Sequence, residues 1–270
     1  MRPLSARNPR VTRLGRLARR REERAEQRAL IVEGPVLLGA ALDAGAEVLD
    51  VYVDEASQHR HLVAAVLRRL PEWVDPWVLP VGTLDRVGDA ATSQGLAAVV
   101  ARPVADWPEP ATAGFVVVLA DVADPGNAGT LIRAAVASGA GAVVVAAGVD
   151  ASHPKVVRSS AGAVFSIPVV SVDEPDRAVE GLRAGGYRLV GTVVDGGVAH
   201  HQADLSDPVA VVLGNETRGL AAELAGRLDL LVTIAMPGPA ESLNVAMAGT
   251  VICFEVLRQR RAAQGAPHRG

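Results

Sequence analysis

Four short and almost unbroken apolar runs in the second half of the chain constrain its fold most. They read FVVVLA, GAVVVAA, YRLVGTVV and PVAVVLG, at residues 115–120, 141–147, 187–194 and 208–214. Helical segments are expected between and after them, at residues 128–138, 175–184, 220–225 and 243–261. Strands that are apolar on both faces are typical of a parallel sheet covered by helices on two sides. The sequence therefore predicts an α/β fold with a parallel sheet in this half.

The first half predicts a smaller α/β unit followed by a linker. Helices are expected at residues 35–44 and 59–70, and strands at residues 47–53, 73–81 and 95–103. Residues 102–113 are rich in Pro and Ala with little periodicity, which is typical of a linker. We therefore expect one domain at residues 29–105 and a second at residues 113–262.

The first 28 residues are strongly basic. They hold ten arginines against three glutamates, although the whole chain carries a net charge of -3. Such a segment neutralises phosphates, so a basic N-terminal arm that binds RNA or DNA is expected at residues 1–28. The alternative is a solvated amphipathic helix. With three Trp, two Tyr and three Phe in 270 residues, the sequence does not favour binding mainly by base stacking.

Composition restricts where the protein works. The apolar runs are far shorter than the roughly 20 residues that cross a bilayer, and no apolar stretch follows the basic start, so neither a membrane segment nor a signal peptide is expected. The single cysteine, Cys253, excludes a disulfide framework within one chain and favours a reducing compartment, the cytoplasm.

Polar and glycine residues gather in three loops of the second half, each expected at the end of a strand. The first loop contains Asp124, Pro125, Gly126 and Asn127, with Arg133 on the helix that follows. The second reads GNETRG at residues 214–219, and the third reads MPGPAESLNVAMAG at residues 236–249. In open α/β sheets, ligands bind outside the carboxyl ends of the strands. We therefore expect the three loops to form one site.

Common nucleotide and metal motifs do not fit these loops. The GAGA at residues 139–142 precedes a strand instead of following one, and GNETRG lacks the Gly-Lys-Ser/Thr ending of a P-loop. No Cys or His set has the spacing of metal ligands, and the pair His200 and His201 is interpreted as a surface loop, so no metal is expected.

The three loops resemble the motifs of the SpoU (TrmH) family of RNA ribose 2′-O-methyltransferases, in the SPOUT superfamily. Asn127 and Arg133 match the first motif, residues 214–219 match Gly-x-Glu-x-x-Gly, and residues 242–244 match Ser-Leu-Asn. Residues 153–170 are similar to the family's connecting segment. The first half is similar to its N-terminal substrate-binding domain, so the resemblance covers nearly the whole chain.

The resemblance implies a parallel sheet tied in a deep trefoil knot, a ribosomal-protein-like N-terminal domain, a homodimer, S-adenosylmethionine as cofactor and ribosomal RNA as substrate. It implies catalytic roles for Asn127, Arg133, Glu216, Ser242 and Asn244. It implies cofactor contacts from Leu213, Gly214, Asn215, Gly219, Ala235, Met236, Gly238, Ser242, Leu243, Asn244 and Ala246. Because arginine has a pKa above about 12, we expect Arg133 to clamp an RNA phosphate and stabilise the alkoxide rather than act as a base.

Structural roles remain open for the same residues. Ser242 could be a helix N-cap with Asn244 in the first turn, and Glu216 could be an acidic group favoured by the dipole at a helix N-terminus. Arg133 could be a solvent-facing helix residue paired with a carboxylate. The functional alternatives are a tRNA ribose 2′-O-methyltransferase, a base methyltransferase of the same superfamily and a non-catalytic RNA-binding module.

Overall fold

The computed structural model describes residues 1–89, 92–103, 105–109, 114–206 and 208–263. The chain forms two compact units. The N-terminal unit comprises Met1–Val104 and Ser152–Ser166, and the C-terminal unit comprises Ala105–Ala151 and Ile167–Gly270. Among the described residues, no helix is long and apolar enough to cross a membrane.

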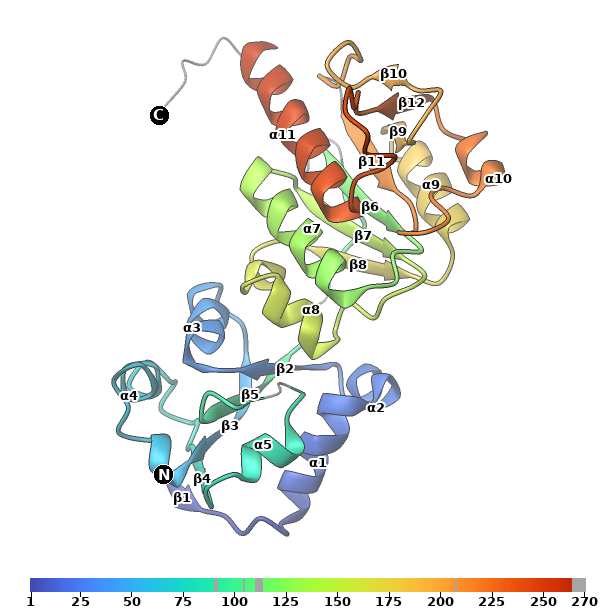
Figure 1. Ribbon diagram of the computed structural model, residues 1–270. Helices are drawn as coiled ribbons and strands as arrows, with labels where there is room; N and C mark the ends of the chain where they lie inside the picture. Colours follow the sequence, from blue (N-terminus) through green and yellow to red (C-terminus); the bar gives the residue numbers. More distant parts are fainter. Residues whose placement is uncertain (90–91, 104, 110–113, 207, 264–270) are drawn as a thin grey trace. The chain divides into compact units, whose positions relative to one another are not determined.

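The C-terminal unit contains a seven-stranded sheet in the order β10-β12-β9-β11-β6-β7-β8 (Figure 1). Every pairing in it is parallel, which confirms the predicted α/β fold. The strands are β6 (Val116–Ala120), β7 (Ala142–Ala146), β8 (Val169–Val172), β9 (Arg188–Thr192), β10 (Val198–Ala199), β11 (Val209–Leu213) and β12 (Leu230–Thr233). The sequence patterns did not predict β8, β10 or β12, which are short or half-exposed.

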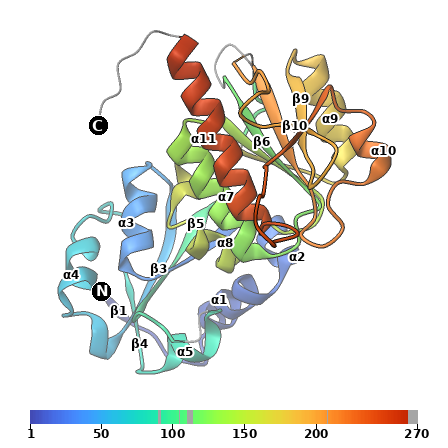
Figure 2. The same ribbon diagram turned by 45° about the horizontal axis from the view of Figure 1, so that its top comes forward.

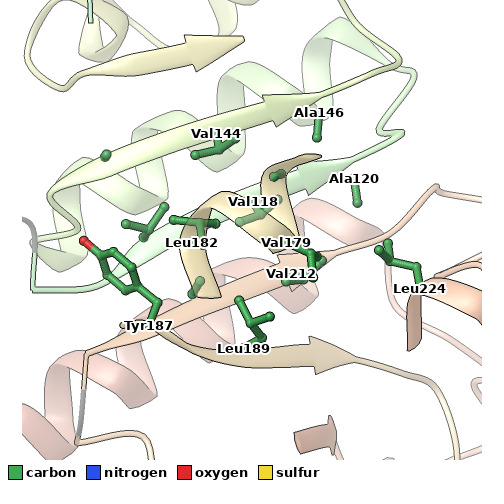
Figure 3. Close-up of a cluster of buried hydrophobic side chains, with 14 residues drawn as sticks. Val118, Ala120, Val144, Ala146, Val179, Leu182, Tyr187, Leu189, Val212 and Leu224 are labelled. Carbon is green, nitrogen blue, oxygen red and sulfur yellow. The ribbon is translucent and has the colours of Figure 1, made fainter. Parts of the chain in front are cut away.

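Helices cover both faces of this sheet. Helices α9 (Pro175–Ala184) and α10 (Ala222–Ala225) pack on one face, where alternate residues of the central strands form the buried cluster drawn in Figure 3. Val118 and Val212 belong to this cluster. Leu213 points to the other face because side chains alternate along a strand. That face is covered by α7 (Pro125–Ser138) and α11 (Val245–Ala263), which lie side by side in Figures 1 and 2.

Local sequence determines where α7 begins and ends. The Asp124 side chain accepts a hydrogen bond from the Asn127 N–H at 2.9 Å, so it caps the first turn, and Pro125 fits the first helical position. Gly139 ends the helix with φ of 79°, a left-handed conformation that glycine adopts without strain. The predicted helix at residues 128–138 is therefore confirmed and begins three residues earlier.

The last helix returns toward the centre of the sheet. Strand β12 lies beyond β9 as seen from β11, yet α11 packs against α7 and β11. Gly249 permits this approach, since a Cβ at that position would lie 2.3 Å from Leu131 Cδ2 and 2.7 Å from Leu213 Cδ1. Residues 234–244 therefore carry the chain back across the carboxyl ends of β9 and β11.

The N-terminal unit has a five-stranded mixed sheet in the order β1-β4-β3-β5-β2. Strand β5 pairs antiparallel with β2 and β3, and β4 pairs parallel with β1 and β3. The strands are β1 (Arg2–Pro3), β2 (Ala29–Glu33), β3 (Val48–Asp54), β4 (Trp77–Leu79) and β5 (Leu96–Ala101). Helices are α1 (Pro9–Arg19), α2 (Arg21–Glu26), α3 (Pro35–Asp43), α4 (His61–Leu67), α5 (Thr83–Val87) and α8 (Pro154–Ser159), with short 3-10 turns η1 (Glu55–Ser57) and η2 (Ala163–Phe165).

The predicted basic arm is part of this unit rather than an extension. Most of it forms α1 and α2, and α1 buries Val11, Leu14 and Leu17 in the core with strands β2 and β5. These residues follow the spacing of one helix face, and the arginines occupy the other positions. The domain that was expected to begin at residue 29 therefore includes the residues before it. Helix α1 is amphipathic and packed, and nucleic-acid binding by its arginines stays a prediction.

The second difference concerns residues 152–166, which were expected to belong to the methyltransferase domain. They fold with the N-terminal unit, where α8 packs against β2. The reason is burial and charge: Val156 and Val157 are fully buried, and the Arg158 guanidinium pairs with both Glu33 and Asp89. Of the predicted linker at residues 102–113, residues 104 and 110–113 lie outside the described part of the chain.

Candidate cofactor and active site

The loops that carry the three motifs all follow strands of the C-terminal unit. The first follows β6, the second follows β11, and the third follows β12. Strands β6 and β11 are neighbours and end level with each other, since Leu119 pairs with Leu213. Because all these strands are parallel, the loops emerge at one edge of the sheet.

The second motif forms a closed turn. The Asn215 N–H donates to the Gly219 carbonyl at 3.0 Å, and the Gly219 N–H donates back to the Asn215 carbonyl at 2.9 Å. Gly219 has φ of +67°, and a Cβ on Gly214 would lie 2.4 Å from the Gly219 carbonyl carbon. The two glycines are therefore required by the turn itself.

Glu216 links this turn to the first motif. Its carboxylate accepts the Ala123 N–H at 3.0 Å, the Asp124 N–H at 2.9 Å and the Asn127 amide at 3.0 Å. Partial burial raises the pKa of Glu216, but the hydrogen bonds from Asn127 and from the two backbone groups outweigh it, and the net pKa is lowered. Glu216 is thus held ionised at the start of α7.

Asn244 joins the third motif to the other two. Its side-chain amide donates to Asn127 Oδ1 at 3.0 Å, while its own Oδ1 accepts the backbone N–H groups of Ala246 at 2.9 Å and Met247 at 3.3 Å. Asn244 is therefore the N-cap of α11. The alternative in which Ser242 is this N-cap is wrong. The chain Asn244 to Asn127 to Glu216 is called the amide relay below.

Arg133 stands apart from this relay. It lies on the exposed side of α7 and makes no hydrogen bond or ion pair with any residue that the structure describes. Its guanidinium is therefore available to a ligand or to another chain. Of the structural alternative, the solvent-facing position of Arg133 is confirmed, but the expected pairing with a carboxylate is absent among the described residues.

A cavity of about 330 Å³ opens between the second and third loops. Its walls come from the ends of β9 and β12, the closed turn, and the start of α11. Of the residues with an expected cofactor contact, those that line it are Gly214, Asn215, Gly219, Met236, Ser242 and Leu243. Those that do not line it are Leu213, Ala235, Gly238, Asn244 and Ala246.

Two features of the cavity were missed by the sequence analysis. Thr192, Val193 and Val194 line it from the end of β9, and Arg218 lines it from the closed turn. The position of β9 beside β11 explains the first, because its carboxyl end meets the same edge. Residues 187–194 were predicted as a strand, so the sequence did indicate that a further strand ends near this cavity. Arg218 lies inside the second motif, at a position that the motif leaves variable.

Among the described residues, no group of three or more His, Cys, Asp or Glu side chains could hold a metal ion. The cavity is lined by backbone amides, hydroxyl groups and apolar side chains such as Leu220 and Ile252, with Glu216 and Arg218 as its charged residues. Its volume lies at the lower end of the range for small-molecule sites, about 300–1,000 Å³. Fold and site together define an α/β protein that binds an organic ligand at the carboxyl edge of a parallel sheet.

Comparison with known proteins identifies the family. Residues 114–254 match the SpoU rRNA Methylase family. The chain is 32% identical over 237 residues to the 23S rRNA (guanosine(2553)-2′-O)-methyltransferase RlmP of Bacillus subtilis, covering 87% of this chain and 91% of that protein. It is 42% identical over 171 residues to the 23S rRNA (uridine(2479)-2′-O)-methyltransferase of Streptomyces viridochromogenes, covering 60% of each.

A solved structure agrees over nearly the whole chain. The SpoU methyltransferase AviRb from Streptomyces viridochromogenes, in complex with the cofactor AdoMet, aligns with a TM-score of 0.85 and 32% identity, covering 94% of this chain and 98% of that chain. The protein belongs to the SpoU methyltransferase family. The predicted family, enzyme class and α/β fold class are confirmed.

Proposed function

We propose that the protein transfers a methyl group from S-adenosylmethionine to a ribose 2′-hydroxyl of ribosomal RNA in the cytoplasm. The observation that carries this proposal is the cavity of about 330 Å³ walled by the second and third motifs, with the first motif joined to them by the amide relay. The named relatives that methylate 23S rRNA support the choice of RNA.

The residues present fit S-adenosylmethionine. Val193, Leu220 and Ile252 offer apolar surface for an adenine, while the Thr192 and Ser242 hydroxyls and the backbone of the closed turn offer polar partners. When bound, this cofactor supplies an electrophilic methyl group on a sulfonium. The remaining predicted contacts have indirect roles: Leu213 and Ala246 pack behind the cavity, and Ala235 and Gly238 lie in the exposed third loop.

Within this proposal, Arg133 acts on the acceptor. The 2′-oxygen must lose its proton and approach the methyl carbon in line, so positioning supplies a large part of the catalysis. An arginine whose side chain has no partner among the described residues can clamp the adjacent phosphate through its planar fork and stabilise the developing alkoxide. The proton passes to the phosphate or to water, because a guanidinium does not lose its own proton readily.

Asn127, Glu216 and Asn244 are proposed as positioning residues. The Glu216 carboxylate already accepts three hydrogen bonds, and the Asn127 amide uses both its donor and its acceptor in the relay. These groups therefore fix the start of α7 relative to the start of α11. Ser242 lines the cavity and takes a direct role in binding.

A homodimer fits the surface of α11. Met247, Val251 and Phe254 lie three or four residues apart on α11 and are exposed by 65%, 39% and 46%, and Leu243, just before the helix, is exposed by 38%. An apolar stripe of this kind is costly in water and is typical of an interface. Because Arg133 is not among the residues that line the cavity, we propose that a second copy of the chain brings this arginine to its partner's cofactor.

The trefoil knot remains a proposal as well. It is supported by the return of residues 234–244 across β9 and β11 before α11 packs on α7. Parallel sheets very rarely thread a chain through a loop, so family membership carries most of this inference.

Substitution of Arg133 tests the function. We expect Arg133→Ala to lose nearly all methyl transfer to ribosomal RNA, and Arg133→Lys to retain a measurable fraction because it keeps a cation without the fork. Affinity for S-adenosylmethionine should change little in both. The control is Arg177→Ala, since Arg177 is exposed on α9 across the sheet and should be dispensable.

Alkaline hydrolysis identifies the product. A methylated 2′-oxygen cannot attack its own phosphate, so label from a ribose product is recovered in an uncleaved dinucleotide. Label found only in single nucleotides would indicate a base methyltransferase. Label found only on tRNA would show that the substrate is tRNA rather than ribosomal RNA. Failure of the protein to bind S-adenosylmethionine by calorimetry would leave a non-catalytic RNA-binding module as the better description.

A further inference from the structure

Arg218 is a charged group in the cavity that the proposed mechanism does not use. Among the described residues that line this cavity, it carries the only positive charge, and Glu216 carries the only negative one. The Arg218 guanidinium forms an ion pair with Asp121, and the two side chains are 74% and 42% exposed. Arg218 thus lines the cavity with an exposed side chain, while its partner Asp121 is not among the lining residues.

One side chain fixes the backbone at both ends of this ion pair. Asn215 Oδ1 accepts the Arg218 N–H at 3.2 Å and the Thr217 N–H at 3.0 Å, while Asn215 Nδ2 donates to the Asp121 carbonyl at 2.9 Å. Asp121 itself has φ of +61°, a left-handed conformation that Asp and Asn tolerate better than most residues. The structure thus holds the carboxylate opposite the guanidinium by fixing both main chains.

The ion pair itself is weak. Exposed pairs contribute little to stability because water competes for both groups and the side chains lose freedom. A second oxyanion that approaches through the cavity can therefore replace the Asp121 carboxylate at little cost. Arginine is well suited to this exchange, since its five donors match the two oxygens of a carboxylate or phosphate.

Glu216 does not provide an alternative partner for Arg218. Its carboxylate is occupied by the Ala123 and Asp124 N–H groups and by the Asn127 amide. Its negative charge offers no partner to an anionic ligand. An anion that enters is therefore drawn toward Arg218.

We propose that Arg218 is an oxyanion-binding residue of this cavity. Its guanidinium pairs with Asp121 in the absence of a ligand, and it binds a ligand carboxylate or phosphate in place of Asp121 when one is present. The inference rests on the proposed function, in which two sources of such an anion exist. One is the carboxylate of the methionine part of the cofactor, and the other is a phosphate of the RNA.

Two ligands separate these sources. S-adenosylhomocysteine carries the carboxylate, and 5′-methylthioadenosine shares its adenosine and sulfur but lacks the amino-acid part. If the anion is the cofactor carboxylate, calorimetry should show Arg218→Ala weakening S-adenosylhomocysteine at least tenfold and leaving 5′-methylthioadenosine unchanged. If the anion is a phosphate, both affinities stay unchanged, while binding to deproteinised 23S ribosomal RNA weakens and its salt slope falls by about 0.7–0.9.

Asp121→Asn distinguishes a binding role from a structural one. It removes the competing carboxylate but keeps the carbonyl that Asn215 holds, so affinity for the anionic ligand should equal or exceed that of the wild type. A residue that merely stabilised the turn through the ion pair would show the same loss in Asp121→Asn and Arg218→Ala. Arg218→Lys should recover part of the affinity.

The matched control is Arg227→Ala, which removes another exposed, ion-paired arginine that is not among the residues lining the cavity. It should leave all three ligands bound as in the wild type. Unchanged affinity of Arg218→Ala for S-adenosylhomocysteine and RNA, or equal losses in Asp121→Asn, would overturn the inference and leave the proposed function intact. A wild-type protein that bound neither nucleoside would overturn both.

Discussion

Asn244 makes two kinds of hydrogen bond, and two substitutions at this position separate them. Its oxygen caps α11 by accepting from Ala246 and Met247, and its amide donates to Asn127. Asn244→Asp keeps an oxygen for the cap and places a charge that the helix N-terminus favours by about 0.3–1 kcal/mol. It cannot donate to Asn127, however. Asn127 Oδ1 would then face a carboxylate instead of a donor, while its Nδ2 still donates to Glu216.

The stability effects follow from these bonds. Asn244→Ala loses the cap, worth about 1 kcal/mol, and the bond to Asn127, worth about 1 kcal/mol more. In a unit of about 150 residues, 1 kcal/mol shifts Tm by roughly 2–4 °C, so Asn244→Ala should lower the Tm of the C-terminal unit by about 4–8 °C. Asn244→Asp should lower it by less than about 3 °C, because the gain at the helix terminus offsets the lost bond.

Both variants should nevertheless lose most methyl transfer, since each breaks the amide relay. Differential scanning calorimetry measures the Tm of each variant, and the methylation assay measures turnover on the same preparations. Asn8→Ala is the stability control, because it removes the cap of α1 and should affect only the N-terminal unit. Equal destabilisation by Asn244→Asp and Asn244→Ala, or full activity in Asn244→Asp, would refute the division between cap and relay.

Three further predictions concern packing, pH and assembly. Gly249→Ala should destabilise the C-terminal unit by about 1–2 kcal/mol in calorimetry, since overpacking against Leu131 and Leu213 outweighs the gain in helix propensity, whereas Gly15→Ala, with its nearest atoms at 3.6 Å, should be neutral or stabilising. The pKa of Glu216 is lowered in the folded protein, so its ionised form stabilises the fold at pH values above its ordinary pKa of 4.5. The stability advantage of the wild type over Glu216→Gln, measured in unfolding titrations, should therefore shrink as the pH falls below 4.5. Met247→Lys should dissociate the proposed homodimer in light scattering, and an unchanged mass would exclude α11 from the interface.

The parallel sheet could be predicted because each strand carries its own signal. A run such as Val116–Ala120 is apolar on both faces, and this pattern does not depend on its neighbours. The fate of residues 152–166 could not be predicted in the same way. Val156 and Val157 need a core, but nothing local states which of the two cores they join. For α1, the apolar spacing was visible, yet the ten arginines around it directed the interpretation toward an arm.

The same distinction applies to the site, where local patterns could be predicted and contacts between distant residues could not. The three motifs were found because each is a short local pattern, and their gathering at one edge followed from parallel strands. The contacts between them depend on strand order, which the sequence does not state. Glu216 and Asn127 are 89 residues apart, and Asn244 and Asn127 are 117 apart. Whether such residues touch a ligand or one another is therefore decided by the fold.

The amide relay also explains how the cavity and Arg133 are coupled within one chain. Glu216 belongs to the closed turn that forms one wall, and Asn244 directly follows Leu243 in the opposite wall. Both side chains hold Asn127, which lies six residues, less than two helical turns, before Arg133 on α7. Any ligand that orders the two walls therefore also orders the first turn of the helix that carries the proposed acceptor-binding arginine. A substitution in either wall should accordingly change turnover even where cofactor affinity is preserved.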